Sequence, residues 1–180
     1  NASKNNMIKD DTRNKIMNKL YCYYFEARAM KVYDNLVQKM REFNFSTYDS
    51  ITLYSYWFYI TARVAVELKN NLFKHINVYT LTRAHGYDIN EYVNGLNYLP
   101  LRKYLLENLD NVFPVSQHGV DYLNNKYPGF EHKVMVRRLG TKKVTINRNN
   151  NNDVLHIVSC STVRKLKRID LIIEALEILQ

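Results

Sequence analysis

Residues 75–88 have the sequence HINVYTLTRAHGYD, in which a β-rich run passes directly into a polar turn that contains glycine. Residues 75–81 are predicted to form a β-strand. Residues 83–90 are predicted to form the loop that follows it. In parallel α/β sheets, ligands bind beyond the carboxyl ends of the strands. The loop around His85 is therefore the first candidate for a functional site.

Strands and helices alternate on either side of this stretch. Further strands are predicted at residues 51–54, 111–115 and 133–137. Helices are predicted at residues 58–68, 99–109 and 116–126, the last with Ser116 as its N-cap. Strands separated by helices form parallel βαβ units. The sequence thus predicts an α/β fold, with a doubly wound, Rossmann-like parallel sheet and flanking helices.

A long amphipathic helix, residues 11–42, is predicted ahead of the sheet. Its apolar residues recur at the spacing of one helix face, and they are Ala29, Val32, Tyr33, Leu36, Val37 and Met40. Residues 43–50, rich in polar side chains, are predicted to form the loop that ends this helix.

The chain is predicted to contain two parts joined by a polar linker. Residues 3–141 form most of an N-terminal Rossmann-like domain, and residues 142–153, which include four consecutive asparagines, form the linker. Residues 154–180 hold a strand at residues 154–159 and a helix at residues 168–179. Because one strand and one helix cannot enclose a core, we expect residues 154–180 to begin a truncated C-terminal domain, and the chain to be a fragment.

Composition favours a soluble, globular protein. Hydrophobic residues make up 46% of the chain and charged residues 24%, and the formal net charge is +9. The basic residues are scattered, so a solvated basic face and a specific anionic partner both stay open. Cys22 and Cys160 lack metal-ligand spacing and are expected to be reduced thiols. Without a signal peptide or an apolar spanning stretch, a cytoplasmic protein is expected.

Three short motifs follow predicted strands. His85, next to Gly86, can hydrogen-bond a sugar hydroxyl or a phosphate, or it can simply complete a turn. Ser116 begins a helix whose free N–H groups favour anions, although most such serines only cap the helix. Arg138 and Gly140 lie after the fourth strand, where Arg138 can face a cleft or be solvated.

The fourth motif covers residues 159–170, SCSTVRKLKRID. Ser161, Arg164 and Lys167 lie in a small-residue, basic loop between a predicted strand and a predicted helix, which is the layout of a phosphate site. The loop lacks the glycine pattern of a P-loop and that of a dinucleotide fold. A Walker ATPase or a complete Rossmann dehydrogenase is therefore not expected.

Taken in this order, the four motifs resemble glycosyltransferase family 4, the group 1 glycosyltransferases. The stretches RAHGYD, PVSQHG and RLGT are similar to the branch that builds bacterial capsule, exopolysaccharide or lipopolysaccharide. The similarity runs from about Leu20 to the last residue. It implies a GT-B fold and transfer of a sugar from a nucleotide-sugar, with retained anomeric configuration. It also implies that no cofactor and no essential metal take part.

The resemblance also assigns roles to residues. It implies that His85 is the catalytic-site histidine near the donor sugar, with Gly86, Ser116, Arg138 and Gly140 along the cleft. It implies that Lys167, with Ser161 and Arg164, binds the donor diphosphate. Thr162 stands where the family has an arginine, so Arg164 or Lys165 is left to supply the second cation. The family's glycine-rich first loop and its two donor-contacting glutamates are absent.

The sequence therefore leaves two classes of function open. The first is a glycosyltransferase that acts on a glycan or lipid-linked acceptor, in the cytoplasm or in peripheral contact with the inner face of the membrane. As a fragment, the chain alone is not expected to be active, and its C-terminal unit is expected to self-associate. The second is a non-catalytic, basic, Rossmann-like binding module. Nucleic acid is not an expected partner in the first case.

Overall fold

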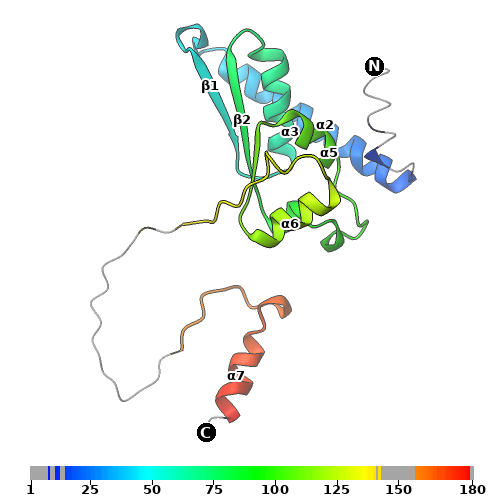
Figure 1. The fold of residues 1–180 in the computed structure, drawn as a ribbon, viewed down its shortest axis with the longest axis vertical. Coiled ribbons are helices and arrows are strands. Elements are labelled where there is room, and N and C mark those ends of the chain that lie inside the picture. Colours follow the sequence, from blue (N-terminus) through cyan, green and yellow to red (C-terminus); the bar gives the residue numbers. More distant parts are fainter. Residues whose placement is uncertain (1–7, 9–10, 13–14, 141, 143–156, 179–180) are drawn as a thin grey trace. The chain divides into compact units, whose positions relative to one another are not determined.

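The computed structural model describes residues 8, 11–12, 15–140, 142 and 157–178. The chain divides into two compact units, residues 1–140 and residues 141–180 (Figure 1). The first unit contains a parallel sheet and most of the helices. The second contains a short basic turn and one helix.

Three parallel strands form the sheet, in the order β1-β2-β3. They are β1 (Ser50–Ser55), β2 (Asn77–Ala84) and β3 (Asn111–Pro114). Ile51 pairs with Val78, and Thr82 pairs with Val112. The predicted parallel α/β sheet is thereby confirmed. Strand β2 ends three residues later than predicted, because β3 pairs with its last four residues, 81–84.

Helices connect the strands, mostly where they are predicted. They are α2 (Ile16–Met40), α3 (Ile60–Glu67), α4 (Gly86–Ile89), α5 (Arg102–Asn108) and α6 (Gln117–Lys126). Helix α3 continues as a π-helical turn, η2 (Leu68–Leu72), and short 3₁₀ turns occur at η1 (Phe45–Thr47) and η3 (Glu91–Val93). Residues 86–89 are helical rather than part of a loop. Helix α5 begins later than predicted because Leu101 is left-handed, with φ 59°.

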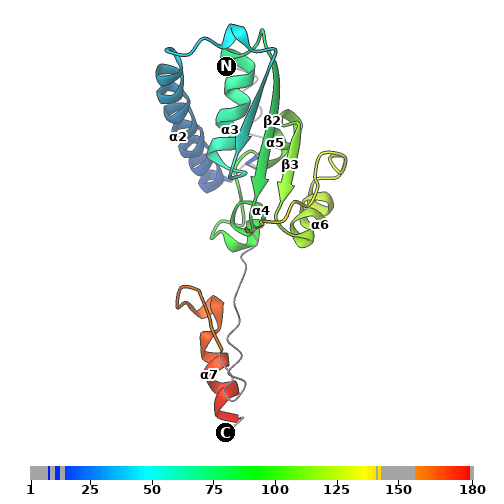
Figure 2. The ribbon, with the colours of Figure 1, turned by 90° about the vertical axis from the view of Figure 1, so that its left-hand side faces the viewer.

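The helices α2, α3, α5 and α6 pack on one face of the sheet. On β2 this face carries Val78 and Ala84, which lie in cores shared with α2, α3, α5 and α6. Figure 2 shows α2 and α3 on the same side. Successive strands are added in one direction, and right-handed crossovers then place every connection on one face. This differs from the predicted doubly wound arrangement. On the opposite face Tyr54 and Tyr79 are exposed.

The segment at residues 133–137 lies beside β3 but is not a regular strand, contrary to prediction. Its one bridge pairs Val112 with Val134 in parallel. The Val112 N–H donates to Lys133 O at 3.0 Å, and the Met135 N–H donates to Val112 O at 3.1 Å. The next bond of the ladder would need an N–H from Pro114, and proline has none. The ladder therefore lacks this one bond, although the Arg137 N–H still donates to Pro114 O at 2.9 Å.

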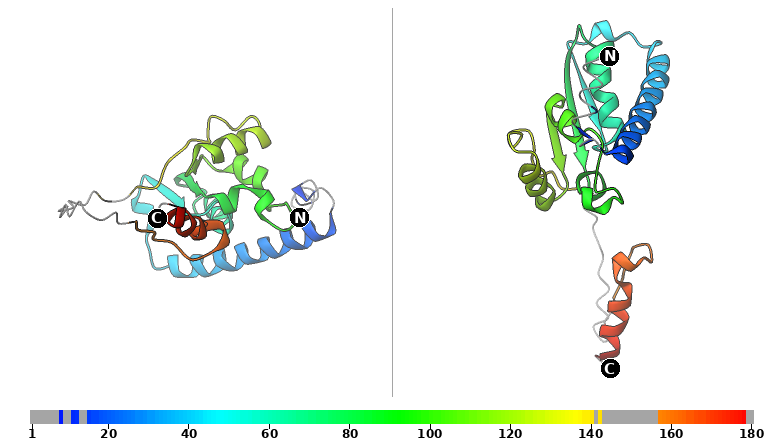
Figure 3. Two further views of the ribbon diagram at one scale, coloured as in Figure 1. Left: turned by 90° about the horizontal axis from the view of Figure 1, so that it is seen from below. Right: turned by 90° about the vertical axis from the view of Figure 1, so that its right-hand side faces the viewer.

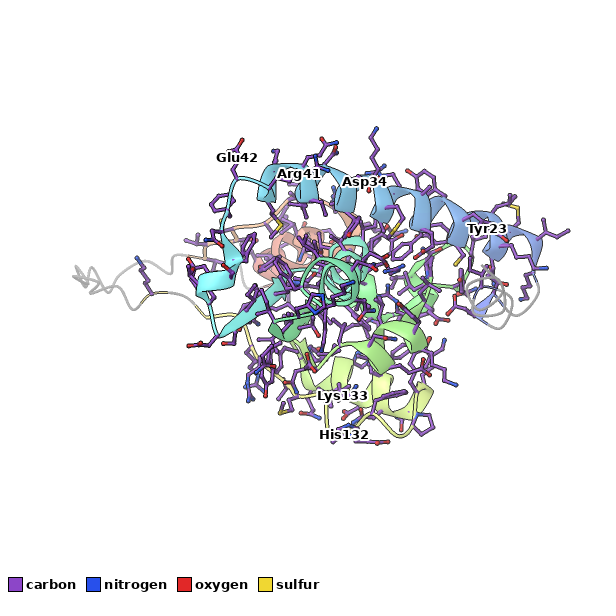
Figure 4. The ribbon with its side chains drawn as sticks, turned by 90° about the horizontal axis from the view of Figure 1, so that it is seen from above. Tyr23, Asp34, Arg41, Glu42, His132 and Lys133 are labelled. Carbon is purple, nitrogen blue, oxygen red and sulfur yellow. The ribbon has the colours of Figure 1, made fainter. Side chains whose placement is uncertain are left out.

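Helix α2 runs along the outer side of the helical layer (Figure 3). Its buried positions are Asn18, Cys22, Phe25, Glu26 and Ala29. Tyr23 and Asp34 point away from the unit (Figure 4), and Leu36, predicted on the buried face, is exposed.

A buried ion pair ties α2 to α3. Arg63 donates through Nε to Glu26 at 2.8 Å and through Nη1 to Glu67 at 2.6 Å. Both Arg63 and Glu26 are almost fully buried. Moving α2 along α3 would separate these buried charges, and a buried charge without its partner is costly. The ion pair therefore fixes the position of α2 on α3.

The second unit is described from residue 157 to residue 178. It holds a 3₁₀ turn, η4 (Lys165–Lys167), and α7 (Ile169–Ile178), and Arg168 between them is left-handed with φ 47°. Residues 157–159 form no strand, because the described part of this unit offers no strand to pair with. The first half of that predicted strand, residues 154–156, lies outside the described residues. Helix α7 buries none of its side chains.

Candidate functional site

The carboxyl ends of the three strands bring three loops to one edge of the sheet. Residues 56–59 follow β1, residues 85–89 follow β2, and residues 115–116 follow β3. Parallel strands end at the same edge, so side chains from distant parts of the sequence meet there. His85, the first predicted site residue, lies at the centre of the three because β2 is the middle strand.

The ring of His85 is held by the loop that follows β1. It packs against Trp57, with ring centroids 4.4 Å apart, and against Tyr56 at 5.1 Å. Its Nε2 lies 3.2 Å from the Tyr56 carbonyl oxygen, so this nitrogen carries the proton in that hydrogen bond. His85 is also the N-cap residue of α4. The imidazole is thus half-buried, oriented and at the sheet edge, and it completes a turn as well.

Asp88 fixes the backbone on both sides of this ring. Its fully buried carboxylate accepts the His85 N–H at 2.5 Å and the Phe58 N–H at 2.7 Å. Burial raises the pKa of Asp88, although these two hydrogen bonds and the charge of Arg102 act against the rise. Asp88 therefore joins the loop after β1 to the turn after β2, and it positions His85 and Trp57 relative to each other.

Arg102 lies beneath the site and was not singled out from the sequence. Its buried guanidinium donates to the carbonyl oxygens of Phe58 and Asp88, the latter at 2.9 Å, and to Pro100 O at 3.2 and 3.1 Å. It also lies 4.4 Å from the centre of the Phe58 ring. Burial lowers the pKa of Arg102. A sequence signal existed, because Arg102 shares the apolar face of its helix with Leu105 and Leu106.

A pocket of about 280 Å³ opens beside His85. Its lining residues come from the loop after β1, the start of α3 and the turn of α4, and they are Trp57, Tyr59, Ile60, Thr61, Tyr87 and Asp88. Trp57 both contacts His85 and lines the pocket. Trp57 therefore links the pocket to the histidine, which itself does not line the pocket. The sequence did not predict this pocket, since its walls come from three segments.

Neither Gly86 nor Gly140, the two glycines predicted to line the cleft, lies where a side chain would clash. A Cβ added to Gly86 would lie 3.6 Å from Asn90, an ordinary contact, and one added to Gly140 would meet nothing within 4 Å. The tightly packed glycine is instead Gly119 in α6. A Cβ there would lie 2.9 Å from Ile89 and 3.0 Å from Pro114. Gly119 lets α6 approach the sheet end.

Ser116 and Arg138 lie at the same end of the first unit. Ser116 Oγ accepts the Gly119 N–H at 3.2 Å, so Ser116 caps α6 as predicted. Arg138 is exposed. Close by in the chain, Arg137 lies 5.6 Å from the centre of the Phe113 ring, and its carbonyl accepts a bond from Arg83. This end of the unit is accordingly basic.

Ser161, Arg164 and Lys167 belong to the second unit, where all three are exposed. The Lys167 N–H donates to Arg164 O at 2.8 Å, which closes the η4 turn just ahead of α7. The turn gathers Arg164, Lys165 and Lys167 within one short basic segment.

The described residues contain neither a metal-binding cluster nor a membrane-spanning helix. No three side chains of His, Cys, Asp or Glu within the described ranges come together as a metal site would need. None of the described helices has the length and apolar character to cross a membrane.

No family model, curated protein or solved structure matches this chain.

Proposed function

We propose that this chain acts in a retaining glycosyltransferase of the GT-B type. The enzyme transfers a sugar from a nucleotide-sugar to a glycan or lipid-linked acceptor, in the synthesis of capsule, exopolysaccharide or lipopolysaccharide. Residues 15–140 supply the acceptor side, and the basic turn ahead of α7 supplies cations for the donor diphosphate. Such acceptors imply action in the cytoplasm, at the inner face of the membrane.

The observation that carries this proposal is the fixed imidazole of His85 at the carboxyl edge of a parallel sheet. The ring is oriented by Tyr56 and Trp57, and its backbone is anchored by buried Asp88. A polar group held in this way loses little conformational entropy when it binds a substrate hydroxyl. His85 therefore positions the transferred sugar by hydrogen bonding, and orientation of this kind contributes to rate.

The leaving diphosphate needs positive charge where its own charge develops. Arg164 and Lys167 are exposed cations in one turn directly before a helix. Cations and helix N-termini favour phosphate oxygens, and preorganised charge of this kind lowers the barrier to departure. We assign donor-phosphate binding to Lys167, with Arg164 and Ser161 beside it.

A basic binding module remains a second candidate, because one observation favours it. The uncovered face of the sheet presents Tyr54, Tyr79 and Phe113 together with Arg83. Aromatic rings interleaved with cations on an open surface suit single-stranded nucleic acid. However, Arg83 is already bonded to Tyr54 Oη at 3.1 Å and to Arg137 O at 2.5 Å. Part of the hydrogen-bonding capacity of the Arg83 guanidinium is thus already used within the protein, which makes this face less suited to binding phosphates.

Calorimetry separates the two candidates. The intact protein is titrated with a panel of nucleotide-sugars, and in parallel with a single-stranded RNA homopolymer at two salt concentrations. We expect saturable binding of a nucleotide-sugar that weakens in Lys167→Ala. Strong RNA binding that falls steeply with salt, with no nucleotide-sugar bound, would instead assign the chain to the binding-module class.

A further inference from the structure

A second pocket opens at the amino ends of the strands, away from His85. Its volume is about 450 Å³, within the usual range for small-molecule sites. It is lined by residues of two segments, 46–49 ahead of β1 and 72–77 ahead of β2. The eight-residue β2 separates this pocket from the His85 turn by roughly 25 Å, at about 3.3 Å for each residue of a strand. In Figure 2 the strands run from this end toward α4, so the pocket is distinct from the candidate site.

The two walls of this pocket are fixed to each other. The ring of Phe45 in η1 packs edge-on against buried Phe73, with ring centroids 5.0 Å apart. Asn44 Oδ1 accepts the Ser46 N–H at 3.1 Å and the Ser46 hydroxyl at 2.6 Å, which holds the turn of η1. The pairing of β1 with β2 also begins here, at the first residue of each strand. A ligand therefore meets a preformed pocket, and little conformational entropy is lost when it binds.

Three polar side chains of the lining have no hydrogen-bond or ion-pair partner in the part of the chain that the structure describes, and they are Asp49, His75 and Asn77. The Asp49 carboxylate accepts hydrogen bonds, whereas the Asn77 amide and the His75 imidazole each donate and accept. Tyr48 and Leu72 add apolar surface, with 61% and 37% of their area exposed. None of the lining residues is a lysine or an arginine. The pocket thus combines unused donors and acceptors with apolar surface, and it lacks a permanent positive charge.

We propose that this pocket binds a neutral saccharide. A sugar ring carries neighbouring hydroxyls along its edge and C–H groups on its faces. Asp49 accepts hydrogen bonds from two neighbouring hydroxyls, while Asn77 and His75 bond further hydroxyls of the ring. The ring of Tyr48 and the side chain of Leu72 contact the C–H groups. Each kind of group on the sugar therefore finds its counterpart in the lining.

Other classes of ligand match this pocket less well. A phosphate or a nucleotide needs cations or free backbone N–H groups, and here its charge would meet the Asp49 carboxylate instead. A hydrocarbon chain would cut off Asp49, His75 and Asn77 from water without giving them a partner, which is costly. A simple ammonium compound would pair with Asp49 but leave the amide and the imidazole without a partner.

Saturation-transfer NMR on the intact protein tests this inference. The probes are neutral disaccharides of glucose, galactose, mannose and N-acetylglucosamine, and inorganic phosphate and ethanolamine serve as competitors. We expect saturable binding of at least one disaccharide, which neither competitor displaces. Asp49→Ala should raise its Kd at least about ten-fold, because hydrogen bonds to a charged group are lost. Asp34→Ala, which removes an exposed aspartate of α2, should leave the Kd unchanged.

Four results would overturn the inference. They are no saturable binding of any disaccharide, displacement by ethanolamine or phosphate, equal effects of the two aspartate variants, and binding that is lost in His85→Ala but retained in Asp49→Ala. The last result would place the saccharide at the His85 edge. Asn77→Ala is a second variant of the pocket with the same expected direction, and circular dichroism checks that each variant is folded. The inference does not rest on the proposed function, because the binding is measured without any sugar transfer.

Discussion

Arg102 is the residue whose loss should most disturb the candidate site. Arg102→Met keeps much of the side-chain length but removes the donors to three carbonyl groups, those of Phe58, Asp88 and Pro100. Hydrogen bonds to a charged group are each worth about 1.5–3 kcal/mol. The buried guanidinium itself costs several kcal/mol to desolvate, and that cost is relieved by the substitution. We expect a net loss of about 3 kcal/mol in the free energy of unfolding.

Urea denaturation followed by circular dichroism measures this loss. With a typical m-value near 2 kcal/mol per molar, the midpoint should fall by about 1.5 M. Lys103→Met is the matched control, since Lys103 is adjacent, exposed and only 3.9 Å from Glu107 in a surface pair. Its effect should stay within about 0.5 kcal/mol. If both variants unfold at the same midpoint, Arg102 does not hold the three segments together and the reasoning fails.

Three further predictions concern other parts of the chain. Burial alone would raise the pKa of Asp110, but the bonds from Lys69 and Thr80 lower it. The difference in the free energy of unfolding between the parent and Asp110→Asn should therefore be largest at pH 7 and shrink as the pH falls below 4. Equal losses at pH 7 and pH 3 in urea titrations would contradict this. Lys167→Ala should weaken nucleotide-sugar binding about ten- to a hundred-fold in calorimetry, which is the scale of a charge-assisted hydrogen bond. An unchanged affinity would exclude Lys167 from the donor site. Deleting residues 142–180 removes the apolar side of α7 and should change the particle mass in light scattering, whereas identical masses would mean that this helix does not associate.

Hydrophobic periodicity was sufficient to predict the strands and most helices of the first unit. It works there because each strand must present apolar residues to the helical layer. It could not predict which face the helices cover, because that depends on the direction in which successive strands are added. The strand predicted at residues 133–137 failed for a local reason, since Pro114 cannot donate to the ladder.

The candidate site was only partly visible in the sequence. His85 could be found because it directly follows a β-rich run. Trp57 and Tyr87 lie 30 positions apart and meet in one pocket only through the parallel pairing of β1 and β2. Asp88 looks like an ordinary surface charge in the sequence, yet it is buried, because its carboxylate accepts the Phe58 N–H of another segment. Contacts of that kind have no signature in spacing.

The most direct test of the proposed function compares sugar transfer by the parent and by His85→Ala. Transfer is measured with the intact protein, as radiolabelled sugar moved from the nucleotide-sugar that binds in calorimetry to a prenyl phosphate acceptor. We predict a fall of about 100-fold in kcat/KM, or about 2.7 kcal/mol of lost transition-state stabilisation, while the circular dichroism spectrum of the folded protein is retained. Equal kcat/KM values for His85→Ala and the parent, or no transfer by the parent, would contradict the assignment of His85 to a glycosyltransferase site.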